Sequence, residues 1–300
     1  MDADRVFAEL TEDPRLPSPH GVALEVLRLA EQEDSTSTDF ARVFQTDPAL
    51  SALLLKLVNS PLTGLRRSIA SIEQAVTILG VQAVKGIALG FSLLNDNRNG
   101  ECDLFDYDRF WSESLGRAVA TSHIAAYTRA WAGDEAYTYG LLGHIGRLGL
   151  AAVYPERYSD VIHTVGALDD EGLEDAEQAV FGIGAAELSG RMLESWGLPA
   201  LRLAIGCDVS GPTGGPTTRH EKLAYALRCG SRIAQLLVDA APPSAVLPTL
   251  TREAHNLQIV PEELPSVFSV ISETWQIAGS ILSVATRNVP ELGEIYARTD

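Results

Sequence analysis

"DPALSALLLKLVNSP", residues 47–61, carries the signals of one complete helix. Asp47 is a residue type that caps helix N-termini, and Pro48 suits the first helical position because an N–H there would lack a helical partner. The leucines of the stretch recur at helical spacing: Leu50, Leu53, Leu54 and Leu57. The stretch therefore predicts a helix that ends near Asn59 and packs its leucine face into a core.

The neighbouring segments follow the same pattern. Residues 21–33 have apolar side chains at helical spacing, and Ser37 is expected to cap the next helix. A capping box, Ser71 and Gln74, begins a further helix, which Gly80 is expected to end. The connectors are short, and no period of about 30–40 residues repeats, so a compact helical bundle is favoured over a solenoid.

Helical periodicity continues to the end of the chain. Helices are predicted at residues 107–131, 184–196, 198–207, 219–240 and 262–286. Alternation typical of strands does not persist anywhere, so the predicted fold class is all-α. "SGPTGGPTT", residues 210–218, predicts a loop or domain boundary, and residues 239–249 form a weaker break.

Charge and cysteine content narrow the possible partners. The formal net charge of −17 over 300 residues disfavours nucleic acid and anionic membranes, and Arg66-Arg67 is only a short basic pair. The three cysteines form no CxxC pair, which leaves zinc-ribbon and redox motifs without support. The acidic N-terminus is not a secretory signal, and no long uncharged apolar run is present. We therefore expect a cytoplasmic protein that binds neither nucleic acid nor membrane.

Four motifs together resemble the HDOD family. They are "LPSP" at 16–19, "DPALSALLLKLVNSP" at 47–61, "SIASIEQAVTILG" at 68–80 and "VKGIALGFSLL" at 84–94. The resemblance implies an N-terminal helical subdomain joined to a degenerate HD-type helical subdomain, together spanning 16–213. Residues 1–15 are then a lead-in helix. Residues 214–300 are a helical extension that could lead to a further domain in a longer protein.

The resemblance also implies where a metal site of the HD type would lie. The position of the first histidine is Glu113, the adjacent His-Asp pair is replaced by Gly143 and His144, and Ala185 stands where relatives often have histidine. No Asp within 227–234 completes the set. Glu113 and His144 could hold at most a weak metal ion, because two ligands rarely make a catalytic site. We expect no catalytic, metal-binding or cofactor-binding residue, and no enzyme activity.

"GLLGHIGRLGL", residues 140–150, has glycine at every third position but matches no phosphate-binding motif. We interpret it as one helix whose glycines form a narrow groove for a closely packed neighbour, with Gly143 at such a contact. The acidic run at 168–178 is interpreted as the solvated start of a helix.

Three functions remain in competition. A non-catalytic bacterial signalling module that acts through a protein partner or a fused output domain is favoured. A metal-dependent phosphohydrolase acting on a nucleotide or cyclic dinucleotide is the first alternative. The second is a small-molecule sensor with a pocket between the two helical subdomains.

Overall fold

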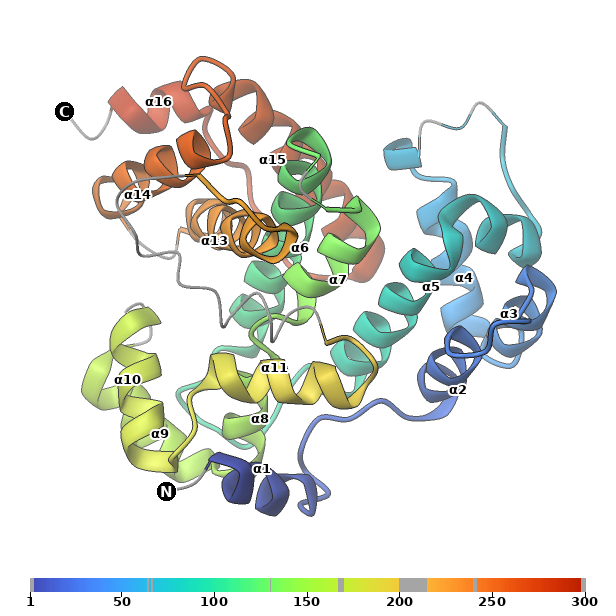
Figure 1. The fold of residues 1–300 in the computed structure, drawn as a ribbon, viewed down its shortest axis with the longest axis horizontal. Coiled ribbons are helices and arrows are strands. Elements are labelled where there is room, and N and C mark those ends of the chain that lie inside the picture. Colours follow the sequence, from blue (N-terminus) through green and yellow to red (C-terminus); the bar gives the residue numbers. More distant parts are fainter. Residues whose placement is uncertain are drawn as a thin grey trace.

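The computed structural model describes residues 3–63, 65, 67–129, 131–166, 170–199, 215–239 and 242–297. The described residues form helices and connecting segments, with no strand among them, so the all-α prediction is confirmed. In Figure 1 the helices of residues 21–58 lie together on the right of the molecule, whereas the first helix, residues 3–11, lies apart from them at the bottom.

The helices follow one another with short connections. The first group is α1 (Ala3–Thr11), α2 (Gly21–Ala30), α3 (Ser37–Phe44), α4 (Pro48–Val58), a 3-10 turn η1 (Pro61–Thr63) and α5 (Ile72–Asp96). The second is α6 (Tyr107–Tyr127), α7 (Gly133–Leu142), α8 (Ile145–Val153), α9 (Pro155–Val165), α10 (Asp170–Phe181) and α11 (Ala185–Ser195). The last is α13 (Arg219–Val238), α14 (Pro243–Asn256), α15 (Leu264–Leu282) and α16 (Leu292–Ala297).

Side-chain caps fix the starts of the N-terminal helices. The Asp47 side chain accepts from the amides of Ala49 and Leu50, as predicted, and Ser71 caps α5. The cap of α3 is Thr36 and not Ser37, because the Thr36 side chain and Asp39 form the reciprocal capping box. Helices α2–α4 and the first part of α5 enclose a separate apolar cluster, the N-terminal cluster.

Helix α5 joins this cluster to the rest of the molecule. Its regular geometry is interrupted at Gly80, where φ is 81°, so the predicted helix end is present and a second helical part follows directly. Ala75 and Val84 belong to the N-terminal cluster, whereas Leu89 and Leu93 belong to the larger main cluster. By length and composition α5 could cross a membrane, but its position between the two clusters accounts for its apolar character.

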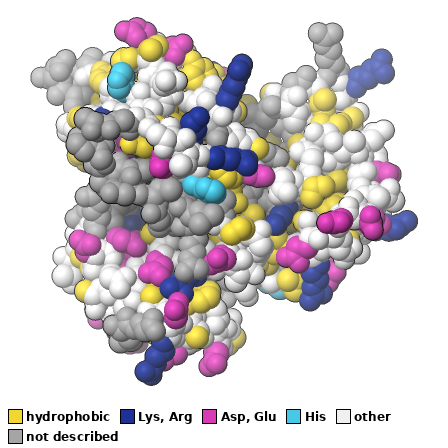
Figure 2. Space-filling model, viewed as in Figure 1, with side chains coloured by type: hydrophobic (Ala, Val, Ile, Leu, Met, Phe, Trp, Pro, Cys, Tyr) yellow, Lys and Arg dark blue, Asp and Glu magenta, His cyan; other side chains and the backbone are white. Residues whose placement is uncertain are grey.

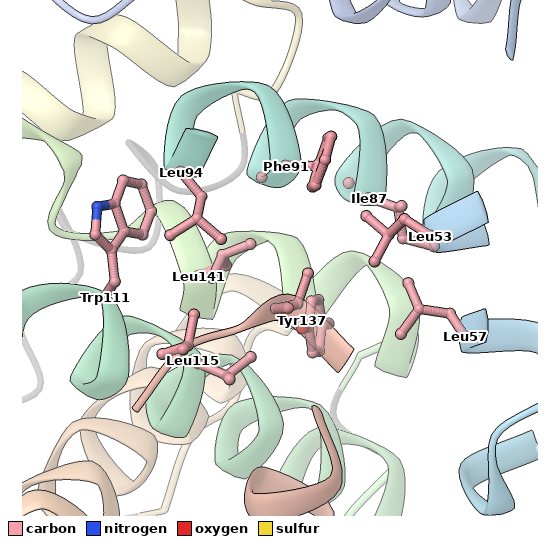
Figure 3. Close-up of a pocket in the computed structure, with 13 residues that line it drawn as sticks. Leu53, Leu57, Ile87, Phe91, Leu94, Trp111, Leu115, Tyr137 and Leu141 are labelled. Carbon is pink, nitrogen blue, oxygen red and sulfur yellow. The ribbon is translucent and has the colours of Figure 1, made fainter. Parts of the chain in front are cut away.

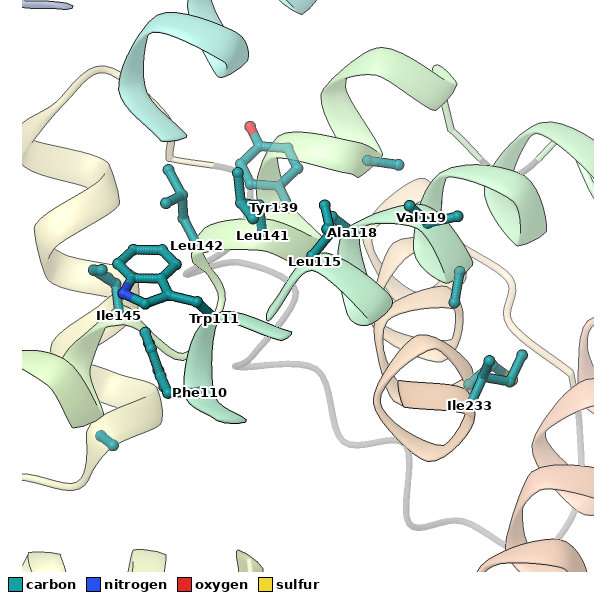
Figure 4. Packing of buried hydrophobic residues seen from close by; sticks show 14 of the residues in the cluster. Phe110, Trp111, Leu115, Ala118, Val119, Tyr139, Leu141, Leu142, Ile145 and Ile233 are labelled. Carbon is teal, nitrogen blue, oxygen red and sulfur yellow. The ribbon is translucent and has the colours of Figure 1, made fainter. Parts of the chain in front are cut away.

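The main cluster is built around α6. Apolar side chains of α6, α7, α8 and α13 interdigitate there, among them Trp111, Leu115, Leu142 and Ile233 (Figure 4). Gly140 of α7 allows close packing, since a Cβ at this position would lie 2.7 Å from the carbonyl oxygen of Arg117 on α6. The backbones of α6 and α7 are therefore in near contact.

The C-terminal helices belong to the same core. The indole of Trp275 on α15 donates to the Ser112 carbonyl at 3.0 Å. Arg98 donates to the carbonyls of Leu282 and Ser283, which end α15, at 3.0 Å each. Residues 198–207 extend beyond the described residues, as does the predicted 213/214 boundary, so the domain boundaries stay a prediction.

Two helix predictions need correction. Residues 140–150 are not one helix: α7 ends at Leu142, and α8 begins at Ile145. The glycines contact different neighbours, because Gly140 packs on α6 whereas Gly146 packs on Ala185 and Ser189 of α11. The chain must turn between Gly140 and Gly146 to bring one glycine against α6 and the other against α11. Helix α6 also ends earlier than expected, at Tyr127.

Gly140→Ala is expected to lower the free energy of unfolding by roughly 1–3 kcal/mol, because the new methyl group meets backbone atoms of α6 that cannot rotate away. The matched control is Gly293→Ala on α16, where a Cβ meets nothing within 4 Å. That change should be neutral or slightly stabilising. Urea unfolding of the three proteins checks this, and equal stability of both variants would contradict the close α6–α7 contact.

Candidate functional site

Glu113, at the predicted position of the first HD ligand, lies in a cleft at the N-terminal half of α6. The cleft encloses about 470 Å³, its open mouth included. Its charged and aromatic lining includes Asp106, Arg109, Glu113, Arg147, Tyr158 and Phe110. We call it the Glu113 cleft. Its lining carries two cationic and two anionic side chains, so its charge is mixed and not that of a simple cation site.

A fully buried carboxylate, Glu177 of α10, lies behind this cleft. Its Oε1 accepts a hydrogen bond from the Tyr158 hydroxyl at 2.6 Å, and its Oε2 accepts from the Ala185 amide at 2.9 Å. The Nε of Arg147 is 3.8 Å from Oε1. These two hydrogen bonds and the nearby guanidinium compensate the loss of hydration that burial of a carboxylate would otherwise cost.

Glu174, one turn earlier on α10, contacts the N-terminal end of α11, as Glu177 does. Both of its carboxyl oxygens lie 3.1 Å from the Ala186 amide. Burial and the nearby Glu177 raise the pKa of Glu174 to about 7, although the Ala186 amide and Arg147 act in the opposite direction. Glu174 therefore exchanges its proton near neutral pH.

The two glutamates act as an external cap for α11. The N-cap residue of α11 is Gly184, which has no side chain to accept from the first amides. The carboxyl groups of Glu174 and Glu177 accept from these amides instead, where the positive end of the helix dipole also favours an acid. The interpretation of 168–178 as solvated is therefore wrong for Glu177, which is fully buried, and for Glu174.

The residues at the HD-type positions lie on separate elements: Glu113 on α6, Gly143 and His144 after α7, and Ala185 at the start of α11. Gly143 and His144 lie in the link between α7 and α8, and Glu113 lines the cleft together with Arg147. At Ala185 the backbone amide, and not a side chain, makes the polar contact. Across the described ranges, no three His, Cys, Asp or Glu side chains come together as they would around a metal ion.

His123 and the two described cysteines lie in surroundings that account for them structurally. The Nδ1 of His123 lies 2.9 Å from the Val119 carbonyl oxygen within α6. Cys102 and Cys229 are buried free thiols, and burial raises the pKa of Cys229. Cys207 and Arg66 lie outside the described residues.

A second hollow lies where the N-terminal cluster meets the main cluster. It encloses about 400 Å³, its open mouth included, and we call it the junction crevice. Its walls come from α4, α5, α6, α7 and the end of α15, and include Leu53, Leu57, Phe91, Trp111, Tyr137 and Leu282 (Figure 3). None of the described residues that line it is charged. This is the place where a sensor pocket was predicted.

The distribution of charged side chains on the surface affects whether nucleic acid could bind. On the face shown in Figure 2, basic side chains share the surface with acidic and apolar ones. Several exposed arginines are paired with acidic neighbours, as in Arg28–Glu25 at 2.8 Å and Arg42–Asp39 at 3.1 Å. Such pairing reduces the attraction that these arginines would exert on phosphate groups.

Glu174→Gln is expected to remove part of the pH dependence of stability. Between about pH 4.5 and 7 the folded protein retains a proton that Glu174 in the unfolded chain has released. This group therefore lowers the free energy of unfolding as the pH rises through that interval. The variant should resemble the wild type at about pH 5 and be the more stable protein at about pH 8.

Urea unfolding at both pH values measures the effect. Asp175→Asn, at an exposed position on the same helix, is the matched control and should show no such difference. Parallel pH profiles for the wild type and Glu174→Gln would contradict the raised pKa.

Comparison with known proteins places this architecture. The model of the HDOD domain matches residues 16–205. The MmoQ response regulator from Methylococcus capsulatus str. Bath is 35% identical, with 84% of this chain and 97% of that chain covered and a TM-score of 0.50. A structure from Shewanella amazonensis SB2B that carries a phosphohydrolase name is 24% identical, covers 92% of this chain and 97% of its own, and has a TM-score of 0.67. At that identity the likeness shows the fold alone.

An uncharacterised protein of Treponema pallidum (strain Nichols) is 26% identical over 204 residues, which are 66% of this chain and 36% of that protein. The chain thus spans about a third of the length of this relative. The family match extends over more than half of the chain, includes every motif of the predicted resemblance and agrees with the all-α fold. The chain belongs to the HDOD domain family.

Proposed function

We propose that this chain is a non-catalytic signal-transduction module that acts through protein contacts. The observation that carries the proposal is the identity of the residues at the predicted metal-ligand positions. Gly143 has no ligating side chain, and His144 replaces the carboxylate of the pair. Glu113 shares its cleft with the cationic Arg147.

The chemistry of the cleft supports this proposal. Hydrolysis by an HD-type site needs a fixed divalent ion that polarises phosphate and activates water. Here the fully buried carboxylate behind the cleft, Glu177, is engaged by Tyr158 and the Ala185 amide. Its interactions hold α9, α10 and α11 together, which is a structural task.

The comparisons support a signalling role through the name of one relative and the length of another. The Methylococcus capsulatus relative is named a response regulator. In the Treponema pallidum protein the matching region is joined to a much longer chain. We propose that the partner here is a protein or a fused output domain in the cytoplasm, and that neither nucleic acid nor a membrane is bound.

A metal-dependent phosphohydrolase is the second candidate. The Glu113 cleft favours it in one respect, since Glu113, Arg109 and Arg147 line a hollow that can admit small molecules. The Shewanella amazonensis structure also carries a phosphohydrolase name, though its likeness shows the fold alone.

The unmodified protein is expected to hydrolyse neither nucleotides nor cyclic dinucleotides above background when manganese or magnesium is added. Chromatography of the reaction products measures this. Metal-dependent turnover that Glu113→Gln abolishes would overturn the non-catalytic proposal. The control is Glu9→Gln, an exposed change on α1 that should leave the result unaltered.

The double variant Gly143→His, His144→Asp is expected to remain inactive and to be less stable. It restores two ligands, but Glu113 still replaces the first histidine, and an under-coordinated ion activates water poorly. A Cβ at Gly143 would lie 2.7 Å from the Tyr139 carbonyl oxygen, so we expect a loss of roughly 1–3 kcal/mol. This contact is with α7 itself, whereas a neighbouring helix was expected. Turnover by the double variant alone would show that the scaffold retains the rest of a metal site.

A further inference from the structure

Helices α9 and α10 lie side by side at the edge of the molecule, and an open groove runs between them (Figure 1). The groove encloses about 500 Å³, its open mouth included, and we call it the α9–α10 groove. Its lining is mainly aliphatic and comes from these two helices alone: Arg157, Asp160, Val161, Thr164, Val165, Ala176 and Val180. Val180 is 39% exposed, so part of this apolar lining is open to solvent.

Arg157 closes one end of the groove and fixes its width. Its guanidinium lies over the rings of Tyr154 and Phe181, 5.4 and 5.1 Å from their centroids, and donates to the Val180 carbonyl at 3.0 Å. These contacts join the start of α9 to the end of α10, so the two helices run antiparallel. The groove is therefore formed before any partner arrives, which lowers the entropy cost of binding.

The walls of the groove restrict the shape of its occupant. Both walls are helices, and an amphipathic helix packs its apolar face into a groove of this kind. The part of the chain that the structure describes contains no strand whose edge could receive an extended peptide. Arg157 covers the rings of Tyr154 and Phe181, so the groove lacks the open aromatic surface on which a proline-rich segment docks.

The charge around the groove restricts the occupant further. Residues 155–181 contain one arginine and no lysine, against eight acidic residues: Glu156, Asp160, Asp169, Asp170, Glu171, Glu174, Asp175 and Glu177. Asp160 lines the groove, and Glu156 and Asp175 are exposed beside it. A second copy of this chain would bring acid against acid, which disfavours a homodimer here. A helix with lysine or arginine beside its apolar face complements the groove in both shape and charge.

We propose that the α9–α10 groove is a docking site for a basic amphipathic helix of a partner protein. The aliphatic side chains of that helix pack on Val161, Ala176 and Val180, and its cationic side chains lie near Asp160 and Asp175. This inference rests on the proposed function, since it names the surface and the kind of partner for a module that acts through protein contacts.

Selection from a displayed library of 16-residue helical peptides, randomised along one face and presented to the full chain, tests the proposal. The selected peptides should share aliphatic residues at positions i, i+3 or i+4, and i+7, with lysine or arginine beside them. Synthetic copies with a fluorescent label should bind saturably in anisotropy titrations. Their affinity should fall as the salt concentration rises, because opposite charges contribute to it.

Variants locate the binding site. Ala176→Trp fills the groove from α10 and should weaken peptide binding by at least about tenfold. Val180→Arg tests the same wall by adding a positive charge, in case the first variant does not fold. Ala179→Trp, at an exposed position of α10 outside the groove, is the matched control and should bind like the wild type.

A second pair of variants tests the charge. Asp160→Lys should weaken binding about three- to tenfold and reduce its salt dependence. Glu273→Lys, at an exposed position of α15, makes the same change in net charge far along the chain and should leave binding nearly unaltered.

Four results would overturn the docking site. They are the absence of any peptide that binds saturably, undiminished binding by the folded Ala176→Trp and Val180→Arg proteins, undiminished binding by Asp160→Lys, and a dimer in light scattering that Ala176→Trp dissociates. The last result would assign the groove to a second copy of the chain. Peptides that bind away from the groove would remove this site and leave a role in protein contacts intact. Metal-dependent turnover would instead overturn the proposed function, so the two fail separately.

Discussion

The close approach of α7 and α13 to α6 is the constraint on which the rest of the structure depends. A Cβ at Gly140 would lie 2.7 Å from the Arg117 carbonyl oxygen, and one at Gly230 would lie 3.2 Å from the same oxygen and collide with Thr121. Two helices thus meet one stretch of α6 backbone, and any larger side chain would separate them. Arg117, itself buried, donates its Nε to the Gly140 carbonyl at 3.1 Å, so the glycine that permits the contact also takes part in a hydrogen bond across it.

Local signals made the N-terminal half predictable. Asp47 and Ser71 cap helices through contacts within three residues, and Gly80 ends one through its own positive φ, so the sequence nearby contains the needed information. The error at Ser37 has the same local origin, since Thr36 precedes it and either hydroxyl could cap α3. Family membership could likewise be predicted, because its motifs consist of these caps and apolar faces.

The site could be predicted only in part, because distant segments determine it. Glycine periodicity at 140–150 does not reveal that Gly140 faces α6 whereas Gly146 faces α11, and the break between α7 and α8 follows from that difference. Glu174 and Glu177 look like members of a solvated acidic run until α11 is placed beside them. Only the glycine at its N-cap, Gly184, hints that the helix needs an acceptor from elsewhere.

Helix α6 gives the two hollows a common wall. Trp111 faces the junction crevice, and Glu113, two residues later, faces the Glu113 cleft. The two hollows are therefore less than one helical turn apart along α6. In the cleft, Tyr158 and Arg147 connect to Glu177, whose partner Ala185 begins α11. Residues behind the HD-type position thus link α8, α9, α10 and α11 to one another, which is a structural use for this part of the fold.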